Sequence, residues 1–273
     1  MSRIIYYYQT FCGLEKILIK NTPVTHIHVS SVHFGLDKKL EPYIHLNNDS
    51  PYSDTFNHVW HDVERADKLG INIVLMIGGA GGGYFSLFSN FDLYYDLLYD
   101  LIKNKSCIKG VDLDIEEGVS LENVQKLINK IVSDFGEEFI ISMAPVEGSL
   151  QHDDSGMGGF CYKTLLKSNE GKHINYLNAQ CYIDYSLGAY DDIINNDYKP
   201  EMIVMGTINP SIMDVVKEVN IKYKKSFGGV FLWEYMFAEP DGYIWAQDVK
   251  DIINPSFLTK LFSYLAFWKY LLL

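Results

Sequence analysis

Short apolar runs alternate with amphipathic stretches of helical period along most of this chain. Eight runs predict β-strands, at about 3–9, 24–32, 71–78, 108–116, 138–144, 174–182, 201–207 and 227–233. The stretches between them predict helices, most clearly at 55–69, 90–103 and 121–135. Strands that are apolar on both faces are typical of parallel sheets covered by helices. The pattern therefore predicts an α/β fold, a single (β/α)8 TIM barrel over residues 1–254.

The length and charge of the chain narrow the classes of partner. With 273 residues, 48% of them hydrophobic, it can bury one large core, and α/β barrels reach this size as one domain. The formal net charge of −12 argues against nucleic acid and anionic membranes as partners. Neutral, polar ligands are compatible with this charge. Ser120 is placed to cap the predicted helix at 121–135, and Gly70 and Gly136 are placed to end two of the helices.

The cysteine spacing and the two ends of the sequence bear on the redox state of the thiols and on the location of the protein. None of the four cysteines stands in a Cys-x-x-Cys pattern, which predicts reduced thiols: Cys12, Cys107, Cys161 and Cys181. The sequence opens without a signal-peptide pattern, so we expect a cytoplasmic or non-classically exported protein. The hydrophobic extension 255–273 contains Lys269 and is too short to span a membrane. We predict a helix there that docks on the barrel or on a partner chain, with an interfacial membrane anchor as the alternative.

A row of acids stands out at 110–117, where the chain reads Gly-Val-Asp-Leu-Asp-Ile-Glu-Glu. Strand side chains alternate between two faces, so Asp112, Asp114 and Glu116 point the same way. Neighbouring carboxylates in a partly buried site cannot all ionise, so at least one is expected to keep a proton near neutral pH. The row therefore predicts general acid/base catalysis at the C-terminal end of the fourth strand, where barrels carry their chemistry.

Other interpretations of the polar motifs are weaker. A Ca²⁺ loop needs Gly at its sixth position, but the sixth residue from Asp112 is Glu117. An aspartyl-phosphate enzyme continues its Asp-x-Asp into Gly-Thr, which this chain lacks. The glycine run 78–83 matches neither a phosphate loop nor a dinucleotide fingerprint, which favours close backbone approach to the acidic strand or to a ligand. His26 and His28 share a strand face but have no further ligand at a telling spacing, so no metal or cofactor is predicted.

Several motifs follow one another at the predicted strand ends. They are Met76-Ile77-Gly78-Gly79, the acidic row with Gly110, then Met143-Ala144-Pro145, Gln180-Cys181-Tyr182 and Gly228-Gly229-Val230-Phe231-Leu232-Trp233. In this order, over residues 3–253, they resemble glycoside hydrolase family 18, the family of chitinases and endo-β-N-acetylglucosaminidases. The resemblance implies a barrel that acts as a glycosidase on glycans containing N-acetylglucosamine.

The resemblance also implies roles for individual residues. Glu116 would donate a proton to the glycosidic oxygen, and Asp114 would hold the N-acetyl group of the substrate and share a proton with Asp112. The acetamido oxygen would attack the anomeric carbon, so hydrolysis would retain configuration without a carboxylate nucleophile. Tyr182 would direct its hydroxyl to the same group, and Trp233 would form the floor under the sugar. Further substrate contacts are expected from Gln180, Gly78, Gly79, Met143 and Tyr8.

Two positions depart from the family pattern, and one loop limits the shape of the groove. Lys109 replaces the first Asp of the motif and Met76 replaces a Ser. By strand parity Lys109 faces away from the row, so we expect it to alter the buried support of the strand. Only residues 208–226 separate the last two strands, which leaves no room for the α+β insertion of deep-cleft chitinases. An open groove is expected.

Chitin or chito-oligosaccharides are therefore the predicted substrates. One alternative is an endo-β-N-acetylglucosaminidase that acts on N-glycan cores. Another, from a different class, is a non-catalytic, chitinase-like lectin that binds chito-oligosaccharides. The replacement at Lys109 favours this lectin, and the retained Glu116 argues against it.

Overall fold

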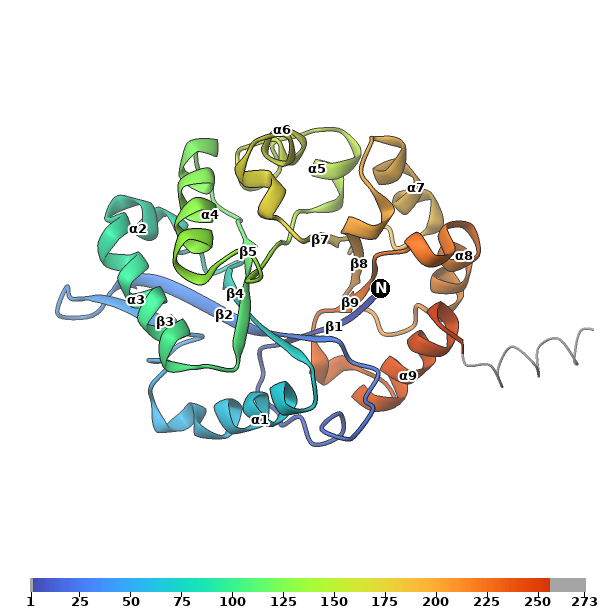
Figure 1. The fold of residues 1–273 in the computed structure, drawn as a ribbon, viewed down its shortest axis with the longest axis horizontal. Helices are drawn as coiled ribbons and strands as arrows, with labels where there is room; N and C mark the ends of the chain where they lie inside the picture. Colours follow the sequence, from blue (N-terminus) through green and yellow to red (C-terminus); the bar gives the residue numbers. More distant parts are fainter. Residues whose placement is uncertain (1, 256–273) are drawn as a thin grey trace, which may run out of the picture.

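The computed structural model describes residues 2–255, which form a closed barrel of parallel strands surrounded by helices (Figure 1). The barrel strands are β1 (Arg3–Tyr8), β2 (His26–Leu36), β4 (Asn72–Gly78), β5 (Ile108–Asp114), β6 (Ile140–Met143), β7 (Tyr176–Gln180), β8 (Ile203–Thr207) and β9 (Gly229–Leu232). Their order is β1-β9-β8-β7-β6-β5-β4-β2, and the pairing of β1 with β2 closes the barrel. Each predicted strand is present, and the predicted (β/α)8 barrel is confirmed.

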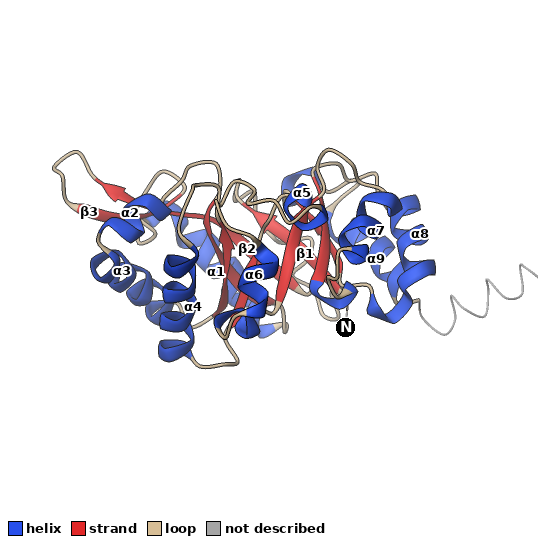
Figure 2. Ribbon diagram, turned by 90° about the horizontal axis from the view of Figure 1, so that it is seen from above, coloured by secondary structure: helices blue, strands red, loops and turns tan. Residues whose placement is uncertain are grey.

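The helices lie outside the barrel and follow the strands in chain order (Figures 1 and 2). They are α1 (Asn57–Lys68), α2 (Tyr84–Ser89), α3 (Phe91–Asn104), α4 (Leu121–Phe135), α5 (Glu147–Gln151), α6 (Tyr162–Lys167), α7 (Leu187–Asn195), α8 (Met213–Tyr223) and α9 (Gly242–Ile253). Short 3₁₀ turns accompany them: η1 (Asp54–Phe56), η2 (Glu170–His173), η3 (Pro200–Met202), η4 (Lys224–Ser226) and η5 (Tyr235–Phe237). Between β8 and β9 the chain forms α8 and η4, without an α+β insertion.

Helix α4 shows how local sequence sets the element boundaries. The Ser120 side chain accepts a hydrogen bond from the Asn123 backbone N–H and so caps the N-terminus. Gly136 ends the helix with φ +86°, a value that residues with a side chain rarely adopt. Both boundaries agree with the sequence prediction. The apolar face of the helix buries Val124, Leu127, Ile128 and Ile131.

The second strand is longer than predicted and continues into a hairpin. β2 extends to Leu36, and β3 (Pro42–Leu46) pairs with it in antiparallel fashion, with His33 opposite His45. The hairpin projects from the barrel near α2 and α3 (Figure 2). The predicted boundary at 32 is wrong: unbroken burial ends at Val32, but the strand continues and pairs with β3. Beyond it only one face of the strand is covered, so polar and apolar residues alternate.

Strand side chains divide the core into two layers. Outward-facing residues of β5, such as Val111 and Leu113, pack under the helices. The inner layer fills the barrel with side chains that are at most 1% exposed: Ile5, Tyr7, Met76, Tyr176, Val204 and Phe231. Because acids and apolar residues alternate along β5, Asp112 and Asp114 face inward, toward the inner layer.

The chain ends bear on two of the sequence predictions. Beyond Pro255 the hydrophobic extension lies outside the described residues, so its predicted helix stays a prediction. Within residues 2–255, none of the helices is both long enough and apolar enough to cross a membrane. The four cysteines are free thiols, of which Cys107 and Cys181 are buried and Cys12 is exposed.

Candidate active site

The acidic row lies at the C-terminal end of β5, inside the mouth of the barrel. β5 ends at Asp114, and Glu116 follows in the loop. Asp112 is fully buried, Asp114 is 5% exposed and Glu116 is half-buried. The three carboxylates share one face of the chain, as predicted, but they occupy three different environments between the barrel interior and solvent.

Asp112 is held by side chains from four other strands. Its Oδ1 accepts hydrogen bonds from Ser142 Oγ at 2.6 Å and from Asn178 Nδ2 at 3.0 Å. Its Oδ2 accepts one from the Tyr7 hydroxyl at 2.7 Å and lies 3.3 Å from His28 Nδ1. Burial acts to raise the pKa of Asp112, but the nearby His28 and the surrounding donors outweigh it and hold that pKa below its ordinary value. Asp112 is therefore an anchored anion.

The pKa of Asp114 is shifted in the opposite direction from that of Asp112. Its Oδ1 accepts a hydrogen bond from Gln180 Nε2 at 3.1 Å, and Gln180 is fixed because it also donates to the Ala144 carbonyl at 2.7 Å. Burial, followed by repulsion from Glu116 and then Asp112, raises the pKa of Asp114 well above its ordinary value. Asp114 is the member of the row that most readily keeps a proton. The proton shared between Asp112 and Asp114 stays a prediction.

Glu116 stands between the buried acids and solvent. Burial raises its pKa from the ordinary value, while a hydrogen bond with Gln180 acts in the opposite direction. A carboxyl group with a raised pKa at the edge of solvent is suited to give a proton to a bound ligand and to take one back. Gln180, a predicted site residue, therefore influences both Asp114 and Glu116.

The loop after β4 approaches the row so closely that it needs glycine. Gly78 and Gly79 have φ +90° and +80°. The Gly79 N–H donates to the Asp114 backbone carbonyl at 2.8 Å, and a Cβ on Gly78 would lie 2.4 Å from the same oxygen. Glu117 fixes the far end of the loop by accepting hydrogen bonds from two of its backbone N–H groups. The close backbone approach predicted for this glycine run is present.

Two predicted aromatic residues border the row. Tyr182 follows β7 and packs on the inner layer. Burial, and then the charges of the acidic row, raises the pKa of Tyr182 well above its ordinary value, so its hydroxyl remains a donor. Trp233 follows β9, with its ring centroid 5.2 Å from that of Tyr7. Both side chains lie at the mouth of the barrel, where they were predicted to meet a ligand.

A cavity of about 680 Å³ opens beside the row, next to the β2–β3 hairpin. Its walls include Gly78, Gly79 and Trp233 from the predicted set. The hairpin adds His45, whose ring stacks on that of Tyr43 with centroids 3.6 Å apart. Unpredicted amide side chains complete the polar lining: Gln9, Asn47 and Asn48. Such a lining suits a ligand rich in hydroxyl and amide groups.

Two residues predicted to contact a ligand lie elsewhere. Tyr8 is buried in the outer layer, where its hydroxyl accepts a hydrogen bond from a backbone N–H at 2.9 Å. Met143 is buried in the same layer. The inward face of each strand belongs instead to the preceding residue, Tyr7 or Ser142, and both of these bind Asp112. The period-2 alternation of the strands is the sequence signal that identifies them.

The replacement at Lys109 acts differently from the prediction. Its side chain faces away from the row, as strand parity predicts, but it is 44% exposed and its Nζ lies 3.4 Å from Asp67 Oδ1. We expected Lys109 to alter the buried residues that support the strand. This expectation is wrong, because this end of β5 reaches the surface. An exposed ion pair of this kind contributes at most about 1 kcal/mol. Met76 does face inward, where its Cα is paired with that of Asp112.

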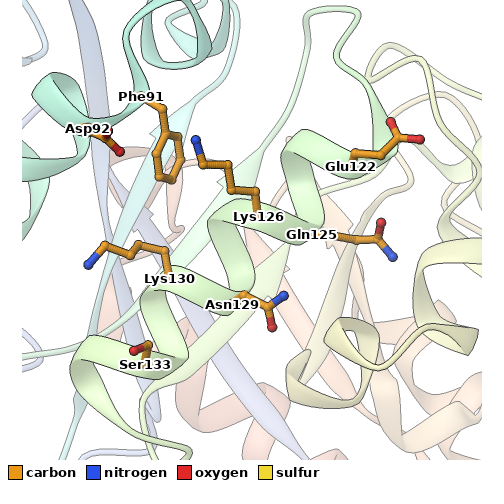
Figure 3. Close-up of a pocket in the computed structure, with 8 residues that line it drawn as sticks. All are labelled: Phe91, Asp92, Glu122, Gln125, Lys126, Asn129, Lys130 and Ser133. Carbon is orange, nitrogen blue, oxygen red and sulfur yellow. The ribbon is translucent and has the colours of Figure 1, made fainter.

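A second hollow, of about 570 Å³, lies outside the barrel between α3 and α4 (Figure 3). Two lysines of α4 line it beside Phe91. Lys126 Nζ lies 3.9 Å from the centroid of the Phe91 ring, and Lys130 forms an ion pair with Asp134. The lysines are thus partnered within the protein, and the hollow shares no residue with the acidic row. We assign no chemistry to it.

Comparisons with known proteins agree with the geometry at the mouth of the barrel. A fungal endo-β-N-acetylglucosaminidase from glycosyl hydrolase family 18 is 28% identical, with a TM-score of 0.82, and the match covers 94% of this chain and 99% of that one. A chitinase from Aspergillus fumigatus is also 28% identical, with a TM-score of 0.78 and coverages of 92% and 99%. No family model and no curated protein matches the chain.

A more distant structure shows the same fold. It is a family 18 chitinase from Pseudoalteromonas aurantia, 18% identical, with a TM-score of 0.70 and coverages of 92% and 99%. Together the neighbours confirm the resemblance to glycoside hydrolase family 18, and they support the prediction of a glycosidase.

Proposed function

We propose that the chain is a glycoside hydrolase that cleaves β-1,4 linkages in glycans containing N-acetylglucosamine, with chitin or chito-oligosaccharides as substrates. The observation that carries the proposal is the arrangement of the acidic row: Asp112 is buried among donors that lower its pKa, Asp114 is buried with a raised pKa, and Glu116 is half-buried with a raised pKa. The polar cavity beside the row and the two neighbours at 28% identity support the same class of substrate.

In the proposed reaction Glu116 donates its proton to the glycosidic oxygen of the leaving sugar. The acetamido oxygen of the sugar at the cleavage point attacks the anomeric carbon as the glycosidic bond breaks. Asp114 accepts a hydrogen bond from the acetamido nitrogen through its unprotonated oxygen, whose partial negative charge partly offsets the positive charge that develops on the resulting ring, while Tyr182 donates to the acetamido oxygen. Water then opens this ring, and Glu116 takes the proton of that water. Two inversions at the anomeric carbon retain its configuration.

Asp112 has no direct contact with the substrate in this scheme. Its negative charge is fixed inside the barrel and raises the pKa of Asp114 by electrostatic repulsion. That repulsion favours the neutral form of Asp114 in the empty site and makes its carboxyl group ready to hold or pass on a proton as the acetamido group becomes charged. The proposed scheme thus has a fixed anion, a movable proton and an acid in sequence along β5 and the loop that follows it.

A second candidate is an endo-β-N-acetylglucosaminidase that acts on N-glycan cores. It is favoured by the neighbour with a TM-score of 0.82, which is such an enzyme. A non-catalytic lectin is expected to have a groove without a working acid. In this chain Glu116 is half-exposed and has a raised pKa, which argues against that alternative.

Incubation with chito-oligosaccharides and, separately, with a high-mannose glycopeptide distinguishes these functions. Products are identified by mass, and Glu116→Gln serves as the control for contaminating activity. Shortened chito-oligosaccharides support the chitinase, and release of the glycan with one N-acetylglucosamine left on the peptide supports the second candidate. Binding of either ligand without any product would contradict a hydrolase and favour the lectin.

A further inference from the structure

His28 is a buried histidine that the proposed reaction has not used. It lies on the inner face of β2 and has no exposed surface. Its Nδ1 is 3.3 Å from Asp112 Oδ2, and its Nε2 is 3.1 Å from the Tyr176 hydroxyl. Nε2 is thus hydrogen-bonded to Tyr176, whereas Nδ1 has no hydrogen bond to any residue that the structure describes and lies within ion-pair distance of Asp112, the buried carboxylate of the acidic row.

The groups around Asp112 show why its negative charge depends on the imidazole of His28. On the adjacent strand β4, the residue paired with Asp112 is Met76, which offers no hydrogen-bond donor. Within residues 2–255 no lysine or arginine forms an ion pair with Asp112, and Lys109 on the same strand is bound at the surface. The other titratable groups that face His28 are Tyr7 from β1, Tyr176 from β7 and His26 from β2.

A buried carboxylate is strongly unfavourable unless charged or hydrogen-bonded partners compensate it. Hydroxyl and amide donors reach Asp112 from Tyr7, Ser142 and Asn178, and all of them are neutral. His28 is the neighbour of Asp112 that can also carry a positive charge. The Tyr176 hydroxyl meets the opposite nitrogen and so fixes the orientation of the ring, as partners of a functional histidine commonly do.

We propose that His28 is a positioning residue, which holds Asp112 as a fixed anion through Nδ1 and so keeps the proton of the row on Asp114. The kinetic consequence rests on the proposed glycosidase function, whereas the pairing of His28 with Asp112 does not. His28 does not touch the substrate. It therefore acts on the rate through the charge of the row rather than through binding.

The kinetic test compares His28→Leu with His26→Leu on chito-oligosaccharides or on whichever glycan the parent cleaves. His26 is a matched control because it lies on the same face of β2, is buried, and is not a partner of Asp112. His28→Leu is expected to lower kcat roughly 10- to 100-fold, because the buried Asp112 loses a polar partner 3.3 Å away, with little change in KM. His28→Asn should restore part of kcat, because its amide nitrogen can take the place of Nδ1.

The pH profile separates positioning from a structural role. Without His28, Asp112 takes up a proton at a higher pH than in the parent, so the acidic limb of kcat/KM should move to higher pH in His28→Leu. His26→Leu should leave this limb in place. An unmoved limb in His28→Leu, or an equal shift in both variants, would overturn the proposal.

A second measurement needs no glycosidase activity. A double-mutant cycle in urea unfolding combines His28→Leu with Asp112→Asn, and the control cycle combines His26→Leu with Asp112→Asn. We expect the first pair to be coupled by about tenfold or more in the unfolding equilibrium constant, and the control pair to be additive within error. Additivity of His28 and Asp112 would overturn the pairing even if hydrolysis were found. Coupling without hydrolysis of any glycan would uphold the pairing and reject the proposed function instead.

Discussion

The glycine loop provides a sharp test of how the acidic row is held. Gly78 and Gly136 both have a positive φ, +90° and +86°, and ψ at Gly136 is 171°. A Cβ on Gly78 would lie 2.4 Å from the Asp114 backbone oxygen and 2.4 Å from Tyr84 Cε2, whereas a Cβ on Gly136 would meet nothing within 4 Å. The substitutions Gly78→Ala and Gly136→Ala therefore share the backbone strain and differ in steric conflict.

The two contributions can be estimated separately. Placing an L-residue in a backbone conformation of positive φ costs about 1–3 kcal/mol, and this applies to both variants. Forcing an additional carbon into a packed interior costs about 1–3 kcal/mol more, and this applies to Gly78→Ala. We thus expect Gly136→Ala to lose about 1–3 kcal/mol of unfolding free energy and Gly78→Ala to lose about 2–6 kcal/mol.

Urea unfolding of the parent and both variants at one pH measures these losses from the midpoint and the slope. Glycan hydrolysis by the folded variants gives a second readout. Gly78→Ala must displace the backbone of Asp114 and should lower kcat, while Gly136→Ala should keep the parental kcat. Equal destabilisation of the two variants, or full activity in Gly78→Ala, would refute the steric argument.

Three further predictions concern the acids and the reaction. Glu116→Gln should lower kcat by roughly 10²–10⁴-fold, with an unchanged circular dichroism spectrum and retained sugar binding, and parental turnover would end its assignment as the acid. Because the pKa of Asp114 is raised on folding, the parent loses stability as pH rises above the pKa of the unfolded chain, so Asp114→Asn should gain stability relative to the parent between pH 4 and pH 8 in urea unfolding. A difference that is independent of pH would contradict this. Deacetylated chitosan oligomers should not be cut, and NMR should show the β-anomer of the product first, whereas an inverted first product would exclude attack by the acetamido oxygen.

Much of the fold and part of the site follow from the strand pattern. The apolar runs locate each barrel strand, and their period of two places Asp112 and Asp114 on the inner face of β5. Tyr8 and Met143 were assigned from the family resemblance, and the same alternation directs them away from the site. For these two residues the local physical rule is more informative than the motif.

Other features depend on barrel closure and leave little trace in the sequence. The hairpin strand β3 is only five residues long, and its buried residues Ile44 and Leu46 are too few to give a clear strand pattern in the sequence. His28 and Asn178 are unremarkable polar residues within their own strands. Only the circular order of the strands brings them to Asp112.

The anchorage of Asp112 also has a consequence for how the chain folds. Its hydrogen-bond partners Ser142, Asn178 and Tyr7 are 30, 66 and 105 residues away along the chain. A partly assembled barrel lacks some of these donors and leaves a carboxylate in an apolar interior without its partners, which is unfavourable. Contacts of such long sequence separation form late and slow the search for the native state. Asp112 therefore penalises open intermediates, and the charge that serves the reaction also makes closure of the barrel more nearly all-or-none.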